Sequence, residues 1–227
     1  MEYAFHIRRY GTREKKAFNL ISVLLERWNE EKFIYKGLIM ASALVLLAEG
    51  FEEIEAVTII DILRRGGVEV NSAFLDGEFA SNLVLGANGI TVEADIPLKS
   101  VAIDEYDIVV LPGGWGGTNH LAENEMSQRV IKEFKKQNKW IAAMCAAPYA
   151  LHVAGVLSKK YTCYPSVEEQ IRPKDRVDDM VVVEDKVITS QGPATAICFA
   201  LEIVKQLVGE DSFNQVKRGT LASYCMN

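Results

Sequence analysis

The feature that most constrains the fold of this chain is an alternation of short apolar runs with helical patterns, which begins at Ser42. Apolar runs typical of buried strands occupy 42–48, 68–75, 107–111 and 140–144. Apolar residues at helical spacing occupy 52–65, 125–138 and 194–208. Strands that alternate with helices predict an α/β fold with a mostly parallel sheet covered on both faces.

Two shorter segments predict antiparallel additions to this sheet. Asp76-Gly77 and Asn88-Gly89 are turn signals around a predicted small hairpin over 83–92. A second hairpin is expected over 180–189, turning at Glu184-Asp185.

Three polar or glycine-rich segments follow strands of the predicted parallel sheet. They are Glu49-Gly-Phe-Glu52, Pro112-Gly-Gly114 and Met144-Cys145. Ligands bind parallel sheets beyond the carboxyl ends of their strands. We therefore expect these segments to converge on one edge and to form the functional site.

The composition excludes several classes of function. A chain of 227 residues with a net charge of −6 has no basic stripe for phosphates, so neither a nucleic-acid site nor a membrane surface is expected. No apolar run approaches the length of a membrane span. Its four cysteines form no metal-like cluster, so we expect no metal, free thiols and a cytoplasmic location. The cysteines are Cys145, Cys163, Cys198 and Cys225.

Residues 1–39 differ in kind from the rest of the chain. Residues 8–16 are dense in charge, and 17–28 could form an amphipathic helix that binds a partner or targets the protein to an organelle. The preferred hypothesis is an over-extended gene model, because Met40-Ala-Ser is a plausible start of translation. We therefore expect an N-terminal extension over 1–39 and one domain over 40–227.

Cys145 is the leading candidate for a reactive group. It lies between the apolar run 140–144 and a helix start at Pro148, a pattern that resembles the nucleophile elbow of α/β hydrolases. The N-terminus of a helix favours an anion and can lower the pKa of a thiol from about 8.5 to roughly 3.5–7.5. The segment alone fits a cysteine that fills a gap in the core equally well.

A carboxyl group and two glycines complete the expected site. Glu52 would reach the sulfur if its strand lies beside the cysteine strand, and a neutral carboxyl there could donate to a thiolate and move protons. Acids in the first turn, Glu53 and Glu55, are explained by the helix dipole. Gly113 and Gly114 present unobstructed N–H groups suited to an oxyanion hole. Residues 115–117 extend a flexible run that could wall a pocket.

Three motifs in order resemble the signature segments of the ThiJ/PfpI superfamily, in the branch of the human parkinsonism-associated deglycase and its bacterial relatives. They lie at 48–56, 109–114 and 142–148, and the similarity spans about 41–221. The resemblance implies a flavodoxin-like three-layer sandwich, a homodimer and a reactive cysteine paired with a protonated glutamate. It assigns Cys145 as nucleophile and Glu52 as its partner, with Gly113, Gly114 and Ala146 as backbone donors.

Two positions depart from that family pattern. The position before Pro165, often histidine in this branch, is Tyr164, and a phenol with a pKa near 10 is a poor base at pH 7. Asn88 replaces an arginine of the family, which weakens the anchoring of acidic groups. The protease, chaperone and amidotransferase branches rely on a histidine after the cysteine or later in the chain. Ala146 follows the cysteine here and no histidine lies beyond His152, so those activities are not expected.

The leading hypothesis is a glyoxalase or deglycase that needs no cofactor. Cys145 would add to methylglyoxal, glyoxal or their adducts with proteins and nucleotides, Glu52 would move the proton, Tyr164 would line the substrate site, and lactate or glycolate would leave. The alternative is a redox-sensing stress-response protein whose cysteine oxidises to sulfinic acid. A structural cysteine in a degenerate homologue is a third interpretation.

Overall fold

The central element of the fold is a sheet of seven strands. The computed structural model describes residues 40–75 and 82–225, and the helices and strands named below lie in the unit Ala41–Asn227. The strand order is β5-β2-β1-β6-β7-β9-β8, and each neighbouring pair is parallel except β8 and β9. The strands are β1 (Ser42–Leu47), β2 (Glu69–Phe74), β5 (Ile96–Pro97), β6 (Ile108–Leu111), β7 (Trp140–Met144), β8 (Val181–Glu184) and β9 (Val187–Ser190).

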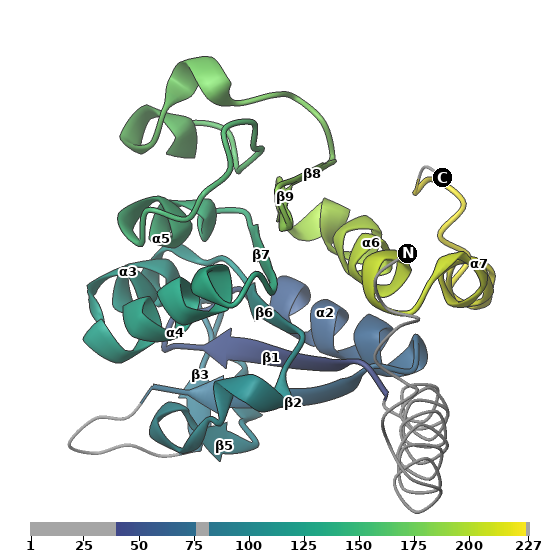
Figure 1. Cartoon of the computed structure of the whole chain (residues 1–227), viewed down its shortest axis with the longest axis horizontal. Helices are drawn as coiled ribbons and strands as arrows, with labels where there is room; N and C mark the ends of the chain where they lie inside the picture. The colour runs from purple at the N-terminus through teal and green to yellow at the C-terminus, as the bar shows by residue number, and fades with distance from the viewer. Residues whose placement is uncertain (1–39, 76–81, 226–227) are drawn as a thin grey trace, which may run out of the picture. The chain divides into compact units, whose positions relative to one another are not determined.

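Helices cover both faces of this sheet, as Figure 1 shows. One face packs against α2 (Glu53–Arg65), α6 (Ala196–Leu207) and α7 (Glu210–Gly219), and the other against α3 (Trp115–Glu123), α4 (Glu125–Lys136) and α5 (Pro148–Val153). Each face has its own buried hydrophobic cluster, because side chains alternate between faces along a strand. The predicted α/β sandwich with a mostly parallel sheet is therefore confirmed.

The central strands are apolar on both sides because both sides are buried. β6 reads Ile-Val-Val-Leu and every one of its residues is buried. α4 instead carries apolar residues on one stripe, with Val130, Ile131 and Phe134 buried and lysines exposed. These two patterns fix the positions of the central strands β1, β6 and β7, and the three polar segments follow the carboxyl ends of these strands.

Both predicted hairpins are present. β3 (Leu83–Leu85) and β4 (Thr91–Glu93) form an antiparallel pair outside the main sheet. β8 and β9 pair at its edge through a turn at Asp185 and Lys186, one residue later than predicted, and both turn residues have positive φ. The hairpin β3–β4 is tied to α2, because Glu53 accepts hydrogen bonds from the Asn88 backbone at 2.6 Å and its side chain at 2.9 Å. Glu53 therefore has a structural contact beyond the helix dipole. The turn signal Asp76-Gly77 lies outside the described residues.

Three expectations were wrong or incomplete. The run at 115–117 is not a flexible extension but the first turn of α3, while α7 was not predicted at all. Cys198 and Cys225 form a disulfide instead of remaining free, because the segment after α7 returns to the side of α6. Cys145 and Cys163 are free.

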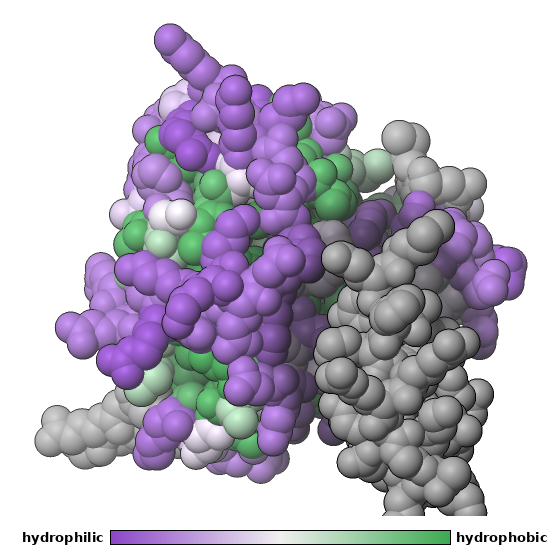
Figure 2. Space-filling view, in the orientation of Figure 1, coloured by the Kyte–Doolittle hydropathy of each residue, from purple (hydrophilic) through white to green (hydrophobic). Residues whose placement is uncertain are grey.

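The polarity of the surface, the length of the helices and the grouping of possible metal ligands relate to membrane and metal binding. Figure 2 shows a face that is mostly hydrophilic, with separate hydrophobic patches near α5 and near the strands β3 and β5. Across residues 40–75 and 82–225, no helix is long and apolar enough to cross a membrane. Within the same ranges no cluster of three or more His, Cys, Asp or Glu side chains could hold a metal ion.

Candidate active site

Cys145 occupies a sharp turn between β7 and α5. Its φ of 59° lies in the left-handed region that residues other than glycine rarely adopt. Hydrogen bonds hold this conformation on both sides: its N–H donates to the Ser190 carbonyl at 2.9 Å, and its carbonyl accepts from the Tyr164 N–H at 2.9 Å. The structure thus has the expected nucleophile elbow, with cysteine at its apex and the side chain partly exposed.

Two backbone N–H groups face the sulfur. The N–H groups of Gly114 and Ala146 lower the pKa of the Cys145 thiol, because they favour a negative charge on sulfur. Gly114 precedes α3 with a φ of 88°, and a Cβ there would come within 2.7 Å of the Glu52 nitrogen. Glycine is therefore required at this close approach. These two donors are where the sequence placed them.

The carboxyl group beside the sulfur belongs to Glu55 and not to Glu52. Glu55 is 0% exposed, and its Oε2 accepts a hydrogen bond from the Gly113 N–H at 2.7 Å. A Cβ placed on Gly113 would lie 2.8 Å from this Oε2 and 3.0 Å from the Cys145 Sγ. The carboxyl oxygen and the sulfur therefore both lie next to Gly113, where only a glycine leaves room for them. The other carboxyl oxygen, Oε1, is buried without a hydrogen-bond partner among the described residues. Gly113 therefore holds the carboxyl group, and its N–H is not free for an oxyanion.

Glu52 instead caps its own helix. It is the N-cap residue of α2 with an extended backbone, and its Oε2 accepts from the Glu55 N–H at 2.8 Å. An N-cap side chain turns back onto the first N–H groups of its helix, which removes it from the sulfur. The side chain of Glu55, one helical turn after Glu52, points into the core instead. The prediction that Glu52 contacts the thiol was wrong, and the dipole explanation for Glu55 was incomplete.

The two acidic groups change each other's titration. Burial, followed by the charge of Glu52, raises the pKa of Glu55 to about 7, against the hydrogen bond from Gly113. Burial and an ionised Glu55 raise the pKa of the Cys145 thiol to about 12, against the two backbone N–H groups. Burial thus opposes the low thiol pKa that the helix start favours. Since two neighbouring anions repel, the pair keeps at least one proton at neutral pH.

Tyr164 lies beside the elbow through its backbone bond to Cys145. Its side chain is exposed, and a Cβ on Gly192 would lie 3.2 Å from the ring. Of the histidines in the described part of the chain, His120 places Nδ1 2.9 Å from the Glu49 carbonyl, and His152 lies on α5. Glu55 is thus the titratable group that the structure shows in contact with the sulfur.

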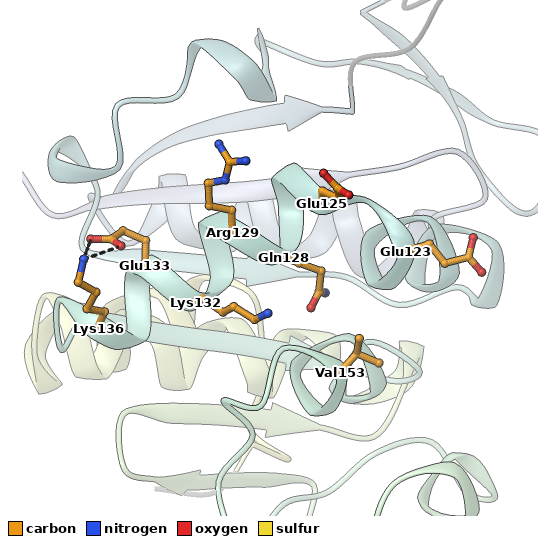
Figure 3. Close-up of a pocket in the computed structure, with 8 residues that line it drawn as sticks. All are labelled: Glu123, Glu125, Gln128, Arg129, Lys132, Glu133, Lys136 and Val153. Atoms are coloured by element: carbon orange, nitrogen blue, oxygen red, sulfur yellow. Dashed lines mark hydrogen bonds and ion pairs between the residues drawn. The ribbon is translucent and has the colours of Figure 1, made fainter.

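A surface groove between α4 and α5 lies apart from this site. Figure 3 shows its charged side chains along α4 and Val153 on α5. None of the predicted site residues lines it. The lining residues are Glu123, Glu125, Gln128, Arg129, Lys132, Glu133, Lys136 and Val153.

Comparison with known proteins places this chain in a defined family. The model of the DJ-1/PfpI family matches residues 41–206. The chain is 41% identical over 186 residues to the protein dj-1beta of Drosophila melanogaster, covering 81% of this chain and 98% of that one. It is 34% identical over 185 residues to the glutathione-independent glyoxalase DJ-1 of Schizosaccharomyces pombe, covering 78% and 96%.

Solved structures agree with this assignment. The crystal structure of Drosophila melanogaster DJ-1beta superposes with a TM-score of 0.75 at 40% identity, covering 80% of this chain and 98% of that one. A structure described as Toxoplasma gondii DJ-1, oxidized, gives a TM-score of 0.74 at 35% identity, covering 80% and 98%. The chain belongs to the DJ-1/PfpI family, in its DJ-1 branch.

Proposed function

We propose that this protein is a glyoxalase that converts methylglyoxal or glyoxal to lactate or glycolate without a cofactor. The observation that carries the proposal is the contact of the Cys145 thiol with the buried carboxyl of Glu55, next to two N–H donors. A relative from Schizosaccharomyces pombe named as a glutathione-independent glyoxalase supports the same chemistry.

The geometry supports a sequence of proton transfers through Glu55. The carboxylate accepts the thiol proton as sulfur bonds to the aldehyde carbon, and the N–H groups of Gly114 and Ala146 stabilise the resulting oxyanion. The oxyanion takes that proton to give a hemithioacetal. Glu55 then removes the hydrogen on the former aldehyde carbon, and a proton returns to the neighbouring carbon to give a thioester. Water hydrolyses the thioester, which releases the hydroxy acid and restores the thiol.

Two finer assignments belong to this proposal. Adducts of the same dicarbonyls on proteins or nucleotides are included as substrates, since an early adduct presents the same carbon to sulfur. Tyr164 contributes a wall of the substrate site and takes no proton, because it contacts Cys145 through its backbone N–H.

The direct test is lactate formation from methylglyoxal by the purified protein. Cys145→Ser should abolish turnover, and Glu55→Gln should lower it by about 100-fold or more, as loss of a general base does. Cys163→Ser, at the other free cysteine, is the matched control and should remain active. Full turnover in Cys145→Ser would overturn the proposal. Lactate release from a glycated peptide, measured beside the free dicarbonyl, decides between the two substrate forms.

A redox sensor is the second candidate, favoured by the oxidised Toxoplasma gondii relative. Hydrogen peroxide would convert the partly exposed Cys145 thiol first to a sulfenic and then to a sulfinic acid, each step transferring one oxygen atom and releasing water. Peptide mass spectrometry after peroxide treatment should show two added oxygen atoms on Cys145 and none on the buried Cys163. A sensor that is not a glyoxalase would show oxidation of Cys145 but would form no lactate from methylglyoxal.

We infer that the protein forms a homodimer through α2 and the hairpin β3–β4. Ile54 and Val57 lie one turn apart on α2 and are 58% and 50% exposed, and Leu85 and Ile90 of the adjoining hairpin are exposed as well. Such a contiguous apolar surface is typical of an interface. Ile54→Asp combined with Val57→Asp should give a monomer in sedimentation analysis, whereas Val153→Asp on α5 should not. A dimer that survives the first pair would place the interface elsewhere.

The cytoplasm remains the proposed location, and the disulfide makes that proposal testable. Disulfides are rare in a reducing cytosol, so Cys198 and Cys225 should be thiols there. Cells lysed under denaturing conditions in the presence of an alkylating reagent should therefore show both cysteines modified. Protection of both from the reagent would indicate an oxidising compartment.

A further inference from the structure

Two aromatic side chains pair at the starts of α3 and α5, the helices that follow Gly114 and Cys145. The rings of Trp115 and Tyr149 pack edge to face, with centroids 6.3 Å apart and an angle of 61° between their planes. Trp115 is nevertheless 41% exposed, so much of the indole is available to a further partner. Tyr149 covers only part of the indole, and a ligand that covered the rest would gain the free energy of burying an aromatic surface.

Both aromatic residues belong to the segments that hold the sulfur. Trp115 begins α3 directly after Gly114, and Tyr149 is the second residue of α5, where its N–H donates to the Ala146 carbonyl at 3.0 Å. Gly114 and Ala146 are the two residues whose N–H groups lower the pKa of the Cys145 thiol. The ring pair therefore bridges the two helix starts at which a substrate carbonyl would be held.

Resting on the proposed function, we propose that Trp115, supported by Tyr149, selects 2-oxoaldehydes that carry a planar aromatic substituent. The bond to sulfur and the two N–H donors fix the reacting carbons, so the substituent is the part of the substrate that can reach the indole. A flat ring stacks on an indole face, whereas the methyl group of methylglyoxal is too small to cover it. The buried carboxyl of Glu55 and the adjacent Glu52 disfavour an anionic substituent, which makes a neutral ring the best fit.

The chemistry of the larger substrate is unchanged. Sulfur bonds to the aldehyde carbon, the hydrogen of that carbon moves to the neighbouring ketone carbon, and water releases an aryl-substituted 2-hydroxy acid. Neither an oxidant nor a reductant is consumed.

The first test compares kcat/KM for phenylglyoxal and methylglyoxal. The natural protein should prefer phenylglyoxal about threefold to tenfold, the range expected for one aromatic contact. Trp115→Ala should remove that preference, Trp115→Phe should retain most of it, and Tyr149→Ala should weaken it. Tyr224→Ala, at an exposed aromatic near the C-terminus, is the control and should leave the ratio unchanged. An equal ratio in the natural protein and Trp115→Ala would overturn the proposal.

A second measurement separates this proposal from the glyoxalase proposal, because it needs no turnover. Phenacyl bromide and iodoacetamide both alkylate Cys145, and only the first carries an aryl ketone. The ratio of their rates at Cys145 should fall about threefold to tenfold in Trp115→Ala and recover in Trp115→Phe. If the protein turns over no 2-oxoaldehyde but the ratio of alkylation rates changes as expected, the glyoxalase proposal is refuted and the aromatic site is supported. If the protein turns over these substrates but the ratio does not change, the aromatic site is refuted and the glyoxalase proposal is supported.

Discussion

At the scale of single residues, the proton shared by Cys145 and Glu55 determines how the site responds to pH. Ionised Glu55 can accept the thiol proton, and protonated Glu55 cannot. Since the pKa of Glu55 is raised to about 7, alkylation of Cys145 by iodoacetamide should speed up as the pH rises through about 7. Cys145 should also react faster than Cys163, which is fully buried.

Glu55→Gln should remove this midpoint near neutral pH. The variant loses the charge that helps to raise the pKa of the thiol, but burial, the largest cause, persists and the proton acceptor is gone. Alkylation at pH 7 should therefore be at least about tenfold slower and should recover only at alkaline pH. Glu52→Gln is the matched control and should keep the midpoint, displaced to lower pH because a charge that raises the pKa of Glu55 is gone. Rates read by peptide mass spectrometry that show the same midpoint in Glu55→Gln would exclude Glu55 as the base.

The same carboxyl group makes the stability of the protein depend on pH. Its pKa is about 7 in the folded chain against 4.5 for an ordinary glutamate, so between these values the native state binds more protons than the unfolded state. Stability contributed by the protonated group is therefore lost as pH rises from 4.5 to 7, by about 3 kcal/mol. Chemical denaturation at pH 5 and pH 8 should show this loss, and Glu55→Gln should lack it. Glu123→Gln, at an exposed carboxyl, should behave like the natural protein.

At the scale of elements, the start of α2 is held by the Glu52 cap. Glu52→Ala should lower the free energy of unfolding by about 0.5–1 kcal/mol, since the Glu55 N–H loses its acceptor. Denaturant titration at pH 7 measures this change, and Glu49→Ala, in the preceding turn, serves as control. A loss of several kcal/mol would mean that Glu52 does more than cap the helix.

The elements also show what the sequence could and could not predict. The alternation of strands and helices predicted the central sheet, and the three strand ends meet at the site as expected. Glu55 could have been found, because it shares a helical face with the buried Ile59, Ile62 and Leu63. A carboxyl four and seven residues before core residues of the same helix points into the core with them.

Other features carried no local signal. Two glycines in the first turn of α3 weaken its helix propensity, and packing against α4 and α5 overrides that preference. The Cys198–Cys225 pair depends on how the chain returns after α7, a contact between residues 27 positions apart. The mutual effect of Cys145 and Glu55 on their titration likewise follows from tertiary burial.

At the scale of the whole molecule, the N-terminal extension should be dispensable. The family match begins at residue 41, and the described site residues all lie beyond it. A chain that starts at Met40 should therefore melt within a few degrees of the full chain and turn over methylglyoxal at the same rate. Melting temperature and lactate formation of the two proteins, measured side by side, check this prediction. A large loss of either would make residues 1–39 part of the working protein.

The backbone at Cys145 has a consequence for engineering this protein. A cysteine at a φ of 59° is held where glycine would fit with less strain, by an amount on the order of 1 kcal/mol. One substitution at this position can thus yield a chain that resists heat better and has no thiol to react. Directed evolution guided by thermal resistance alone would enrich such chains, so any stabilisation campaign on this fold has to score sulfur reactivity in the same round.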